Sequence, residues 1–394
     1  MSQEQHCSTK PNLETLVQAF TTVSVYFLLA VVSILNLISI QPALGALLDF
    51  GSFISAGKAS REGQDPYTTD SPLVFQVNSQ NSDQTLPSPN LNPPVSIFFF
   101  RPLADVNPTK AVFLWRVISA ILFVTGVFIL ARSYPKFTNP VRILWALNLA
   151  GFWNTIALGQ IYAQIFLLAI GVWIFTENKH SILAGITLGM IIAIKPNFIF
   201  WLLLLGVAGQ IATILSAAVT ALVLSLLPVV FFGPQIYQQW LMALSNYPSI
   251  GLLIAGNSSL QSLTARFGSA IPGLILSVFL VIVSLNLAHR SKYIPSKINT
   301  LGIVGSLLIS PFSWAGYTIL ALPILFSRPR WNWWNLLAAI SLSFPYLLIL
   351  YLFQQSRFSS ILFGWLYGWG LLLILIDLIL NKAEESSDSE NHKI

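Results

Sequence analysis

The stretch from Ala111 to Ala131 reads AVFLWRVISAILFVTGVFILA and contains one charged residue, Arg116. About 20 apolar residues in a helix cross the hydrocarbon core of a bilayer, so this stretch predicts a transmembrane helix. The rest of the chain is similar, because 55% of its 394 residues are hydrophobic and 9% are charged. Soluble domains carry charge on roughly a quarter of their residues. The sequence therefore predicts an all-α polytopic membrane protein.

Apolar runs and helix-breaking residues divide the chain into about a dozen candidate spans. The candidates are residues 16–40, 111–131, 143–158, 161–176, 181–194, 197–208, 211–231, 270–289, 300–310, 317–327, 333–353 and 360–380. The first is too long for a cleaved signal peptide. Breaks occur at Lys195-Pro196 and Ser310-Pro311. Since unpaired backbone groups are tolerated only against protein or a wet cavity, we expect both breaks to line a cavity.

The distribution of Lys and Arg predicts the orientation in the membrane. With the N-terminus inside, 12 of the 20 basic residues lie on the cytoplasmic side and 8 outside. The short loops 132–142, 290–297 and 328–330 are all basic, as cytoplasmic loops usually are. Both termini are therefore expected in the cytoplasm of a bacterial cell, with the chain in its plasma (inner) membrane. No Lys/Arg cluster accompanies the net charge of +6, so no nucleic-acid partner is predicted.

This topology gives a single membrane domain, 16–380, between a cytoplasmic N-terminus, 1–15, and a polar tail, 381–394, expected to be disordered. The domain includes one long outer loop, 41–110. Within that loop, residues 71–91 are rich in Gln, Asn, Ser and Pro and are expected to form a flexible insertion.

All carboxylates expected on the outer side lie in this loop, and all 4 His residues are expected inside. A base for acid–base chemistry on the outer face must therefore come from the loop. Asp49 is the best placed, because it follows the first span, and a partly desolvated carboxylate is a better base. A helix-capping or interfacial Asp is the alternative.

Lys195 follows an apolar run and precedes Pro196. A cation within apolar sequence is costly and marks a functional site by default. A lysine that extends to the interface is the alternative. Gln160, Asn257 and the Ser310–Trp314 segment are further polar groups at expected outer helix ends, and each alone is also typical of a turn or cap. The chain has no P-loop, GxGxxG, GxSxG or Cys/His metal motif, which excludes a soluble nucleotide-dependent catalytic domain.

Taken in order, several short segments resemble the integral-membrane glycosyltransferases of family 87 (the DUF2029 group), which have the GT-C architecture. The segments are 49–57 (DFGSFISAG), 63–67 (GQDPY), 92–94 (NPP), 98–103 (FFFRPL), 159–160 (GQ), 195–196 (KP), 257–260 (NSSL) and 310–314 (SPFSW). The resemblance implies a GT-C-like bundle and transfer of a hexose, with mannose the best-known sugar, from a polyprenyl-phosphate donor. The expected acceptor is a lipid or glycan at the outer face.

The resemblance and the chemistry together assign expected roles. Asp49 is the expected catalytic base, and Lys195, Arg101 and Arg266 are expected to bind the donor phosphate. Substrate contacts are expected from Tyr67, Gln160, Asn257, Trp314 and Tyr317, of which Tyr67 and Trp314 pack against sugar or prenyl chain. Direct displacement would invert the anomeric configuration. No cofactor is predicted, and a divalent metal is left open, because the outer carboxylates show no ligand spacing.

One departure from the family pattern concerns a His that often follows the Ser-Pro-x-Ser-Trp segment. Here the sequence continues Trp314-Ala315-Gly316-Tyr317. Either Asp49 works alone, Tyr317 substitutes in part, or the chain is not catalytic in the expected way. Two alternative functions stay open. Broken helices around a charge also occur in secondary transporters, which leaves a transporter or flippase. The missing His leaves a non-catalytic partner in envelope glycan assembly.

Overall fold

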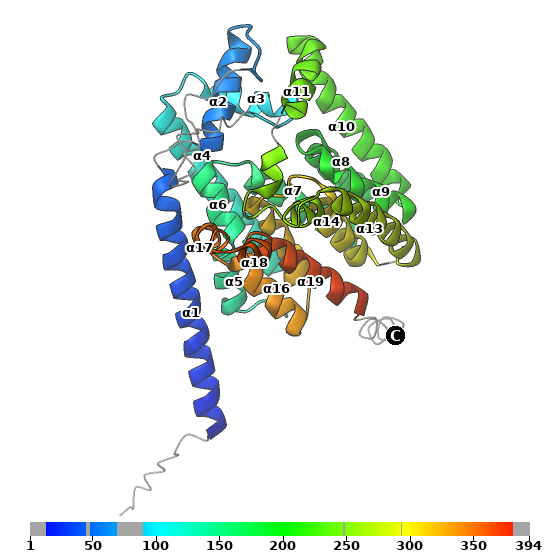
Figure 1. Ribbon diagram of the computed structural model, residues 1–394. Coiled ribbons are helices and arrows are strands. Elements are labelled where there is room, and N and C mark those ends of the chain that lie inside the picture. The colour runs from blue at the N-terminus through cyan, green and yellow to red at the C-terminus, as the bar shows by residue number, and fades with distance from the viewer. Residues whose placement is uncertain (1–12, 45–47, 69–89, 247–248, 293, 381–394) are drawn as a thin grey trace, which may run out of the picture.

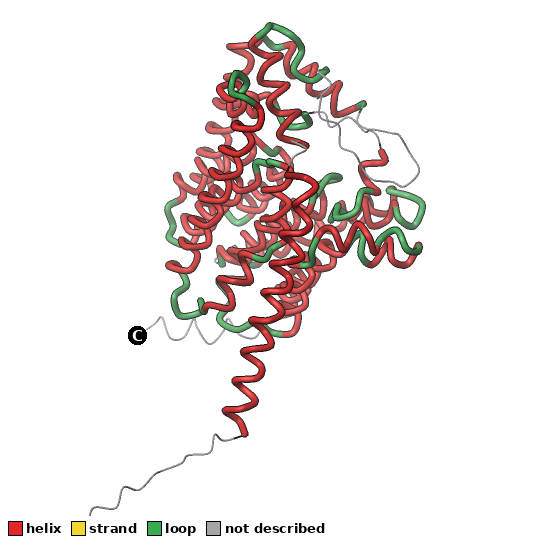
Figure 2. The backbone as a smooth tube through the Cα atoms, turned by 90° about the vertical axis from the view of Figure 1, so that its left-hand side faces the viewer, coloured by secondary structure: helices red, strands yellow, loops and turns green. Residues whose placement is uncertain are grey.

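The computed structural model describes residues 13–44, 48–68, 90–246, 249–292 and 294–380. These residues form helices and no strand (Figures 1 and 2), which confirms the all-α prediction. The α-helices are α1 Leu13–Leu44, α2 Leu48–Arg61, α3 Ile97–Phe100, α4 Pro108–Ser133, α5 Pro140–Leu147, α6 Ala150–Leu158, α7 Tyr162–Glu177, α8 Ser181–Ile194, α9 Ile199–Val207, α10 Ile211–Phe232, α11 Gln235–Ser245, α12 Leu260–Ala265, α13 Ile271–Arg290, α14 Pro295–Ile309, α15 Leu322–Phe326, α16 Trp333–Ser343, α17 Tyr346–Leu352, α18 Arg357–Leu362 and α19 Leu366–Leu380. Short 3₁₀ helices are η1 Pro94–Ser96, η2 Arg101–Leu103, η3 Pro196–Phe198, η4 Ser249–Leu253 and η5 Ala315–Ala321.

Five helical segments in the described residues are long and apolar enough to cross a membrane, and a bent pair would make a sixth. The five are Thr21–Ile38, Lys110–Ser133, Pro140–Leu158, Ile211–Phe232 and Ile271–Arg290. The polytopic class is thus confirmed, but fewer segments meet the length of a full crossing than the dozen predicted. Several other predicted spans are shorter apolar helices, among them α7, α8 and α19. Such short helices need protein around their ends, since lipid cannot satisfy free backbone groups.

The predicted continuous span 333–353 is bent rather than straight. Helices α16 and α17 meet at 84° around Phe344 and Pro345. Phe344 has φ −65° and ψ 127°, an extended conformation, because the residue before a proline avoids the helical region. The proline was visible in the sequence, and its effect on the preceding residue explains the break.

Small residues bring α8 and α10 into close contact. A Cβ at Gly185 would lie 2.4 Å from the Thr213 carbonyl oxygen, and one at Gly189 would lie 2.5 Å from that of Ala217. The two glycines are four residues apart and therefore lie on one face of α8. Close backbone approach through such small residues is a common means of helix association in membranes. It holds the short helix α8, which ends beside Lys195, against the long helix α10.

The ends of the described chain lie toward the same end of the bundle, while α2, α3 and α11 lie at the opposite end (Figure 1). Helix α1 packs at the edge and extends beyond the other helices (Figure 2). The Ser33 hydroxyl of α1 donates a hydrogen bond to Asn148 Oδ1 at 2.7 Å. This contact attaches α1 to the junction of α5 and α6. Residues 1–12 of the predicted N-terminal segment 1–15, residues 71–89 of the predicted insertion 71–91 and the predicted tail 381–394 lie outside the described residues.

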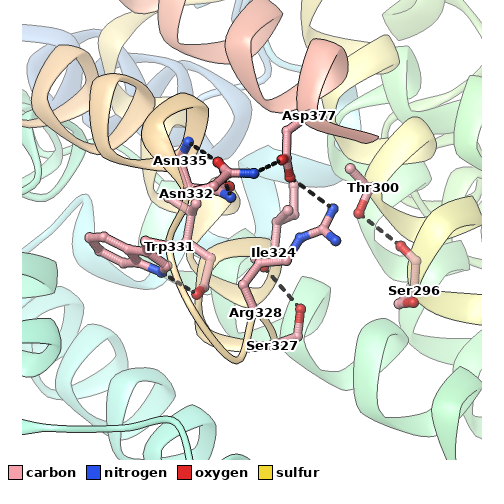
Figure 3. A network of polar contacts seen from close by, with 10 residues as sticks. Ser296, Thr300, Ile324, Ser327, Arg328, Trp331, Asn332, Asn335 and Asp377 are labelled. Atoms are coloured by element: carbon pink, nitrogen blue, oxygen red, sulfur yellow. Dashed lines mark hydrogen bonds and ion pairs between the residues drawn. The ribbon is translucent and has the colours of Figure 1, made fainter. Parts of the chain in front are cut away.

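A polar network ties α19 to the loop before α16 (Figure 3). Arg328 Nη2 lies 3.3 Å from Asp377 Oδ2, and Asp377 is 1% exposed. Asn332 donates its side-chain N–H to the same carboxylate and accepts a hydrogen bond from the Asn335 amide, which caps α16. Since a buried carboxylate requires a cation and hydrogen-bond donors, this network fixes the C-terminal helix to the bundle.

Candidate active site

Asp49 lies in the first turn of α2, and aromatic packing fixes this helix. The buried Phe53 ring stacks on Phe100 with 4.6 Å between centroids. The buried Phe50 ring lies 6.0 Å from Phe100 and 6.0 Å from Trp115. Helix α2 is therefore held against α3 and α4, and its half-buried carboxylate has a defined position.

Gln160 contacts the Asp49 carboxylate directly. Its Nε2 donates a hydrogen bond to Asp49 Oδ2, while its Oε1 is buried and has no hydrogen-bond partner in the described part of the chain. The preceding Gly159 allows this approach, because it has φ 68° and because a Cβ there would lie 2.6 Å from the Cβ of Phe50. One amide atom thus orients the carboxylate, and the other remains available.

Arg116 secures the helix end from which Gln160 follows. Its Nε donates to the Ile156 carbonyl at 2.8 Å and its Nη2 to the Ala157 carbonyl at 2.9 Å. The last carbonyls of a helix lack partners within it and favour a cation. The sequence marks Arg116 only as a charge within a predicted span, so this capping contact was not predicted.

Lys195 lies where α8 ends and η3 begins. It has φ −140° and ψ 89°, as expected before a proline that stops the helix. Its Nζ lies 5.6 Å from the ring centroid of Tyr162 and 5.8 Å from that of Tyr317. The Asp49 carboxylate interacts electrostatically with both Lys195 and Tyr162.

The structure thus brings together four of the nine residues proposed from sequence: Asp49, Gln160, Lys195 and Tyr317. They come from α2, the turn after α6, the end of α8 and η5. Tyr162, which joins them, was not predicted. It lies at the start of an apolar helix, and its sequence gives no signal that separates it from an ordinary core aromatic.

Asn257 connects two loops that are distant in the sequence. Its Nδ2 donates to the Pro311 carbonyl at 3.0 Å, and its Oδ1 accepts from the backbone amides of Ser259 and Ser313, each at 3.1 Å. Asn257 is 0% exposed. Substrate binding by Asn257 stays a prediction, and these contacts favour a structural role that joins two of the quoted motifs.

The two arginines proposed to bind phosphate lie in different surroundings. Arg266 is buried, and its guanidinium donates to the carbonyls of Ile254 and Gly364 at 2.9 and 3.1 Å, an arrangement that favours a structural role. Arg101 is half-buried, with Cζ 5.4 Å from the ring centroid of Phe232. Among the described residues, neither arginine contacts Asp49 or Lys195, and phosphate binding by either stays a prediction.

Tyr67 and α11 hold the ends of the predicted insertion. The Tyr67 hydroxyl donates to the Asn92 carbonyl at 3.0 Å, and Trp240 Nε1 of α11 donates to the Leu91 carbonyl at 3.1 Å. Burial raises the pKa of the Tyr67 phenol well above its ordinary value, so the hydroxyl remains a donor. Trp314 is half-buried and its ring lies 5.9 Å from that of Phe312. The predicted substrate contacts of Tyr67 and Trp314 are not tested by this geometry.

Comparison with known proteins identifies one family. The model described as glycosyltransferase family 87 matches residues 90–311, more than half of the 394-residue chain. No curated protein and no solved structure matches the chain. The matched region contains Gln160 and Lys195, whereas Asp49 precedes it and Tyr317 follows it. In the part of the chain that the structure describes, no group of three or more His, Cys, Asp or Glu residues is placed to hold a metal ion.

Proposed function

The chain belongs to glycosyltransferase family 87, and we propose that it transfers a hexose from a polyprenyl-phosphate donor to a lipid or glycan acceptor. It is a multi-pass membrane glycosyltransferase. In the proposal the sugar is mannose-like, and transfer takes place on the outer face of the plasma membrane. A polyprenyl tail stays in the bilayer, so the phosphate and sugar of such a donor lie at the depth of the helix break beside Lys195.

In the proposed reaction, an acceptor hydroxyl oxygen attacks the anomeric carbon of the donor. The hydroxyl proton passes to the Asp49 carboxylate, and the bond between the anomeric carbon and the phosphate oxygen breaks. Polyprenyl phosphate leaves with the bonding electron pair, and the Lys195 ammonium stabilises its charge. Attack opposite the leaving group inverts the anomeric configuration. Gln160 orients the base and offers its Oε1 to a substrate hydroxyl.

The observation that supports this proposal most is the convergence of a carboxylate and a cation from separate elements. Gln160 donates to Asp49, and the same carboxylate interacts electrostatically with Lys195. A base held by a third group beside a cation is the arrangement that a displacement with an anionic leaving group needs.

The test is transfer of radiolabelled sugar by the purified full chain in lipid nanodiscs. A panel of polyprenyl-phosphate sugars serves as donors and a membrane lipid extract as acceptor. We expect product from one donor, lost by at least about 100-fold in Asp49→Asn, because a positioned general base contributes roughly 10²–10⁴-fold. Glu62→Gln, an exposed carboxylate just beyond α2, is the matched control and should keep full activity.

Full transfer by Asp49→Asn would refute the assignment of the base. Saturable donor binding without transfer from any donor would instead favour a flippase or an assembly partner. Substitution of Lys195 offers a further distinction, because a transporter should depend more on Lys195 than on Asp49.

A further inference from the structure

Two tyrosine rings hold the Lys195 side chain. Its Nζ is almost equidistant from the ring centroids of Tyr162 and Tyr317, at 5.6 and 5.8 Å. The two centroids are themselves 4.3 Å apart, with 51° between the ring planes. Within the described residues, the ammonium makes no hydrogen bond and has no carboxylate oxygen within 4.0 Å. The two rings are therefore its closest partners in the described chain, and the Asp49 carboxylate, with which it interacts electrostatically, lies beyond 4.0 Å.

The rings have fixed positions of their own. Tyr162 is 1% exposed and Tyr317 is 3% exposed. Gly316 packs so closely on Tyr162 that a Cβ there would lie 2.1 Å from the ring. The centroid of the buried Phe198 ring lies 6.1 Å from that of Tyr317. A tyrosine enclosed in this way cannot move aside, so it offers a rigid surface to the cation.

This kind of contact differs from an ion pair in what it leaves free. An aromatic face attracts a cation through its quadrupole and uses none of the three N–H donors of an ammonium. A carboxylate partner would occupy those donors and compete with an incoming phosphate. The ring pair thus offsets part of the cost of removing the half-buried Lys195 side chain from water, while its donors remain available to an anionic ligand.

We propose that Tyr162 and Tyr317 are positioning residues that hold the Lys195 ammonium ready for the phosphate of a lipid-linked donor. This inference rests on the proposed function. In this inference both Tyr162 and Tyr317 act by holding Lys195. Tyr317 then does not replace the His that often follows the Ser-Pro-x-Ser-Trp segment in the family. The plain alternative is that both rings only fill the core.

A double-mutant cycle on binding separates these two roles. The probe is undecaprenyl phosphate, titrated into the purified full chain in detergent, with undecaprenol as the lipid that lacks the phosphate. The variants are Tyr162→Phe, Tyr162→Leu, Lys195→Gln and the double variant Tyr162→Leu/Lys195→Gln. Phe166→Leu is the packing control, because Phe166 is a fully buried aromatic one turn further along α7.

We expect Tyr162→Leu to weaken binding of undecaprenyl phosphate about 5- to 10-fold, because an ammonium that the ring no longer holds must be ordered when the phosphate binds. Tyr162→Phe keeps the ring and should stay within about twofold of the wild type. In the Lys195→Gln background, the same Leu substitution should change affinity by less than about twofold, since the cation is gone. Phe166→Leu should bind as the wild type does.

Equal losses from Tyr162→Leu with and without Lys195 would overturn the inference, as would a loss in Phe166→Leu of the same size. A wild-type chain that binds the phosphate lipid more tightly than undecaprenol, with no effect of Tyr162→Leu, would refute the positioning role alone. A wild-type chain that does not distinguish the two lipids would refute both the positioning role and the proposed donor.

Discussion

Asp49 and Gln160 make the most direct side-chain contact in the candidate site. A carboxylate with one oxygen held by an amide N–H has a restricted orientation, which matters because a general base must point at the proton that it removes. The buried Oε1 of Gln160 adds a second reason for its position, since a buried polar atom is normally hydrogen-bonded in the working state.

Gln160→Ala should therefore lower kcat by about 10- to 100-fold, the loss expected for a hydrogen bond to a charged group. Folding should be retained, because the backbone turn at Gly159 does not depend on this side chain. The measurement is steady-state sugar transfer together with thermal unfolding. Gln355→Ala, which removes an exposed glutamine just after α17, is the matched control. An unchanged kcat in Gln160→Ala would show that Asp49 needs no orienting group.

Residue identity alone could not fully separate residues of the candidate site from residues with a structural role. Asp49, Gln160 and Lys195 stand out in the sequence because polar groups next to apolar runs are costly, and the structure brings them together. Arg266 and Asn257 stand out for the same reason, yet the Asn257 amide and both Nη groups of Arg266 are hydrogen-bonded within the protein. The sequence shows that a polar group lies near a helix end, but not whether a distant carbonyl already satisfies it.

Among the helices, the pair α8 and α10 has the clearest consequence for the site, because α8 ends at Lys195. The close backbone contact at Gly185 and Gly189 sets the height and rotation of α8. A side chain at either position forces the two helices apart, since the atoms that it meets include backbone atoms of α10, which cannot rotate away as a side chain can.

Gly189→Leu should accordingly destabilise the chain by about 1–3 kcal/mol, the usual cost of overpacking. It should also lower transfer activity, because displacement of α8 moves Lys195 away from Tyr162 and Tyr317. Thermal unfolding in detergent and the transfer assay measure the two effects. Leu183→Val, at a 47% exposed position on the same helix, should leave both unchanged. A Gly189→Leu variant with an unchanged melting temperature would contradict the close packing of α8 on α10.

The elements were predictable where the sequence is strongly apolar and less so elsewhere. The runs that became α4, α10 and α13 were identified within a few residues. Helix α11 was missed because three glutamines lower its hydropathy, although Ile236 and Trp240 follow the helical spacing and face the core. Short helices such as α7 and α8 were predicted as segments, but their partners across the bundle are set by packing that a linear sequence does not reveal.

At the scale of the whole molecule, the two ends of the bundle differ in chemistry. The end formed by α2, α3 and α11 lies beside the candidate site, whereas α1 begins and α19 finishes toward the other end (Figure 1). At the latter end, Arg142 donates to the carbonyls of Arg328 and Pro329, so basic residues close the loop before α16. Because basic loops favour the cytoplasmic side, we predict that the candidate site faces the outer side.

This orientation predicts which positions a membrane-impermeant thiol reagent reaches. In a Cys7→Ser background, which removes the single cysteine, Glu62→Cys lies just beyond α2 and Asn178→Cys lies in the turn between α7 and α8. Both native side chains are exposed, so both cysteines should be reactive when reagent has access. In intact cells or right-side-out vesicles, Glu62→Cys should be labelled at once and Asn178→Cys only after permeabilisation.

The reverse labelling pattern would put the candidate site on the cytoplasmic face. Labelling of both positions in sealed vesicles would mean that they do not lie on opposite sides. The expected pattern would require a donor whose sugar reaches the outer face while its tail stays in the bilayer, which is the chemistry of a polyprenyl-phosphate sugar.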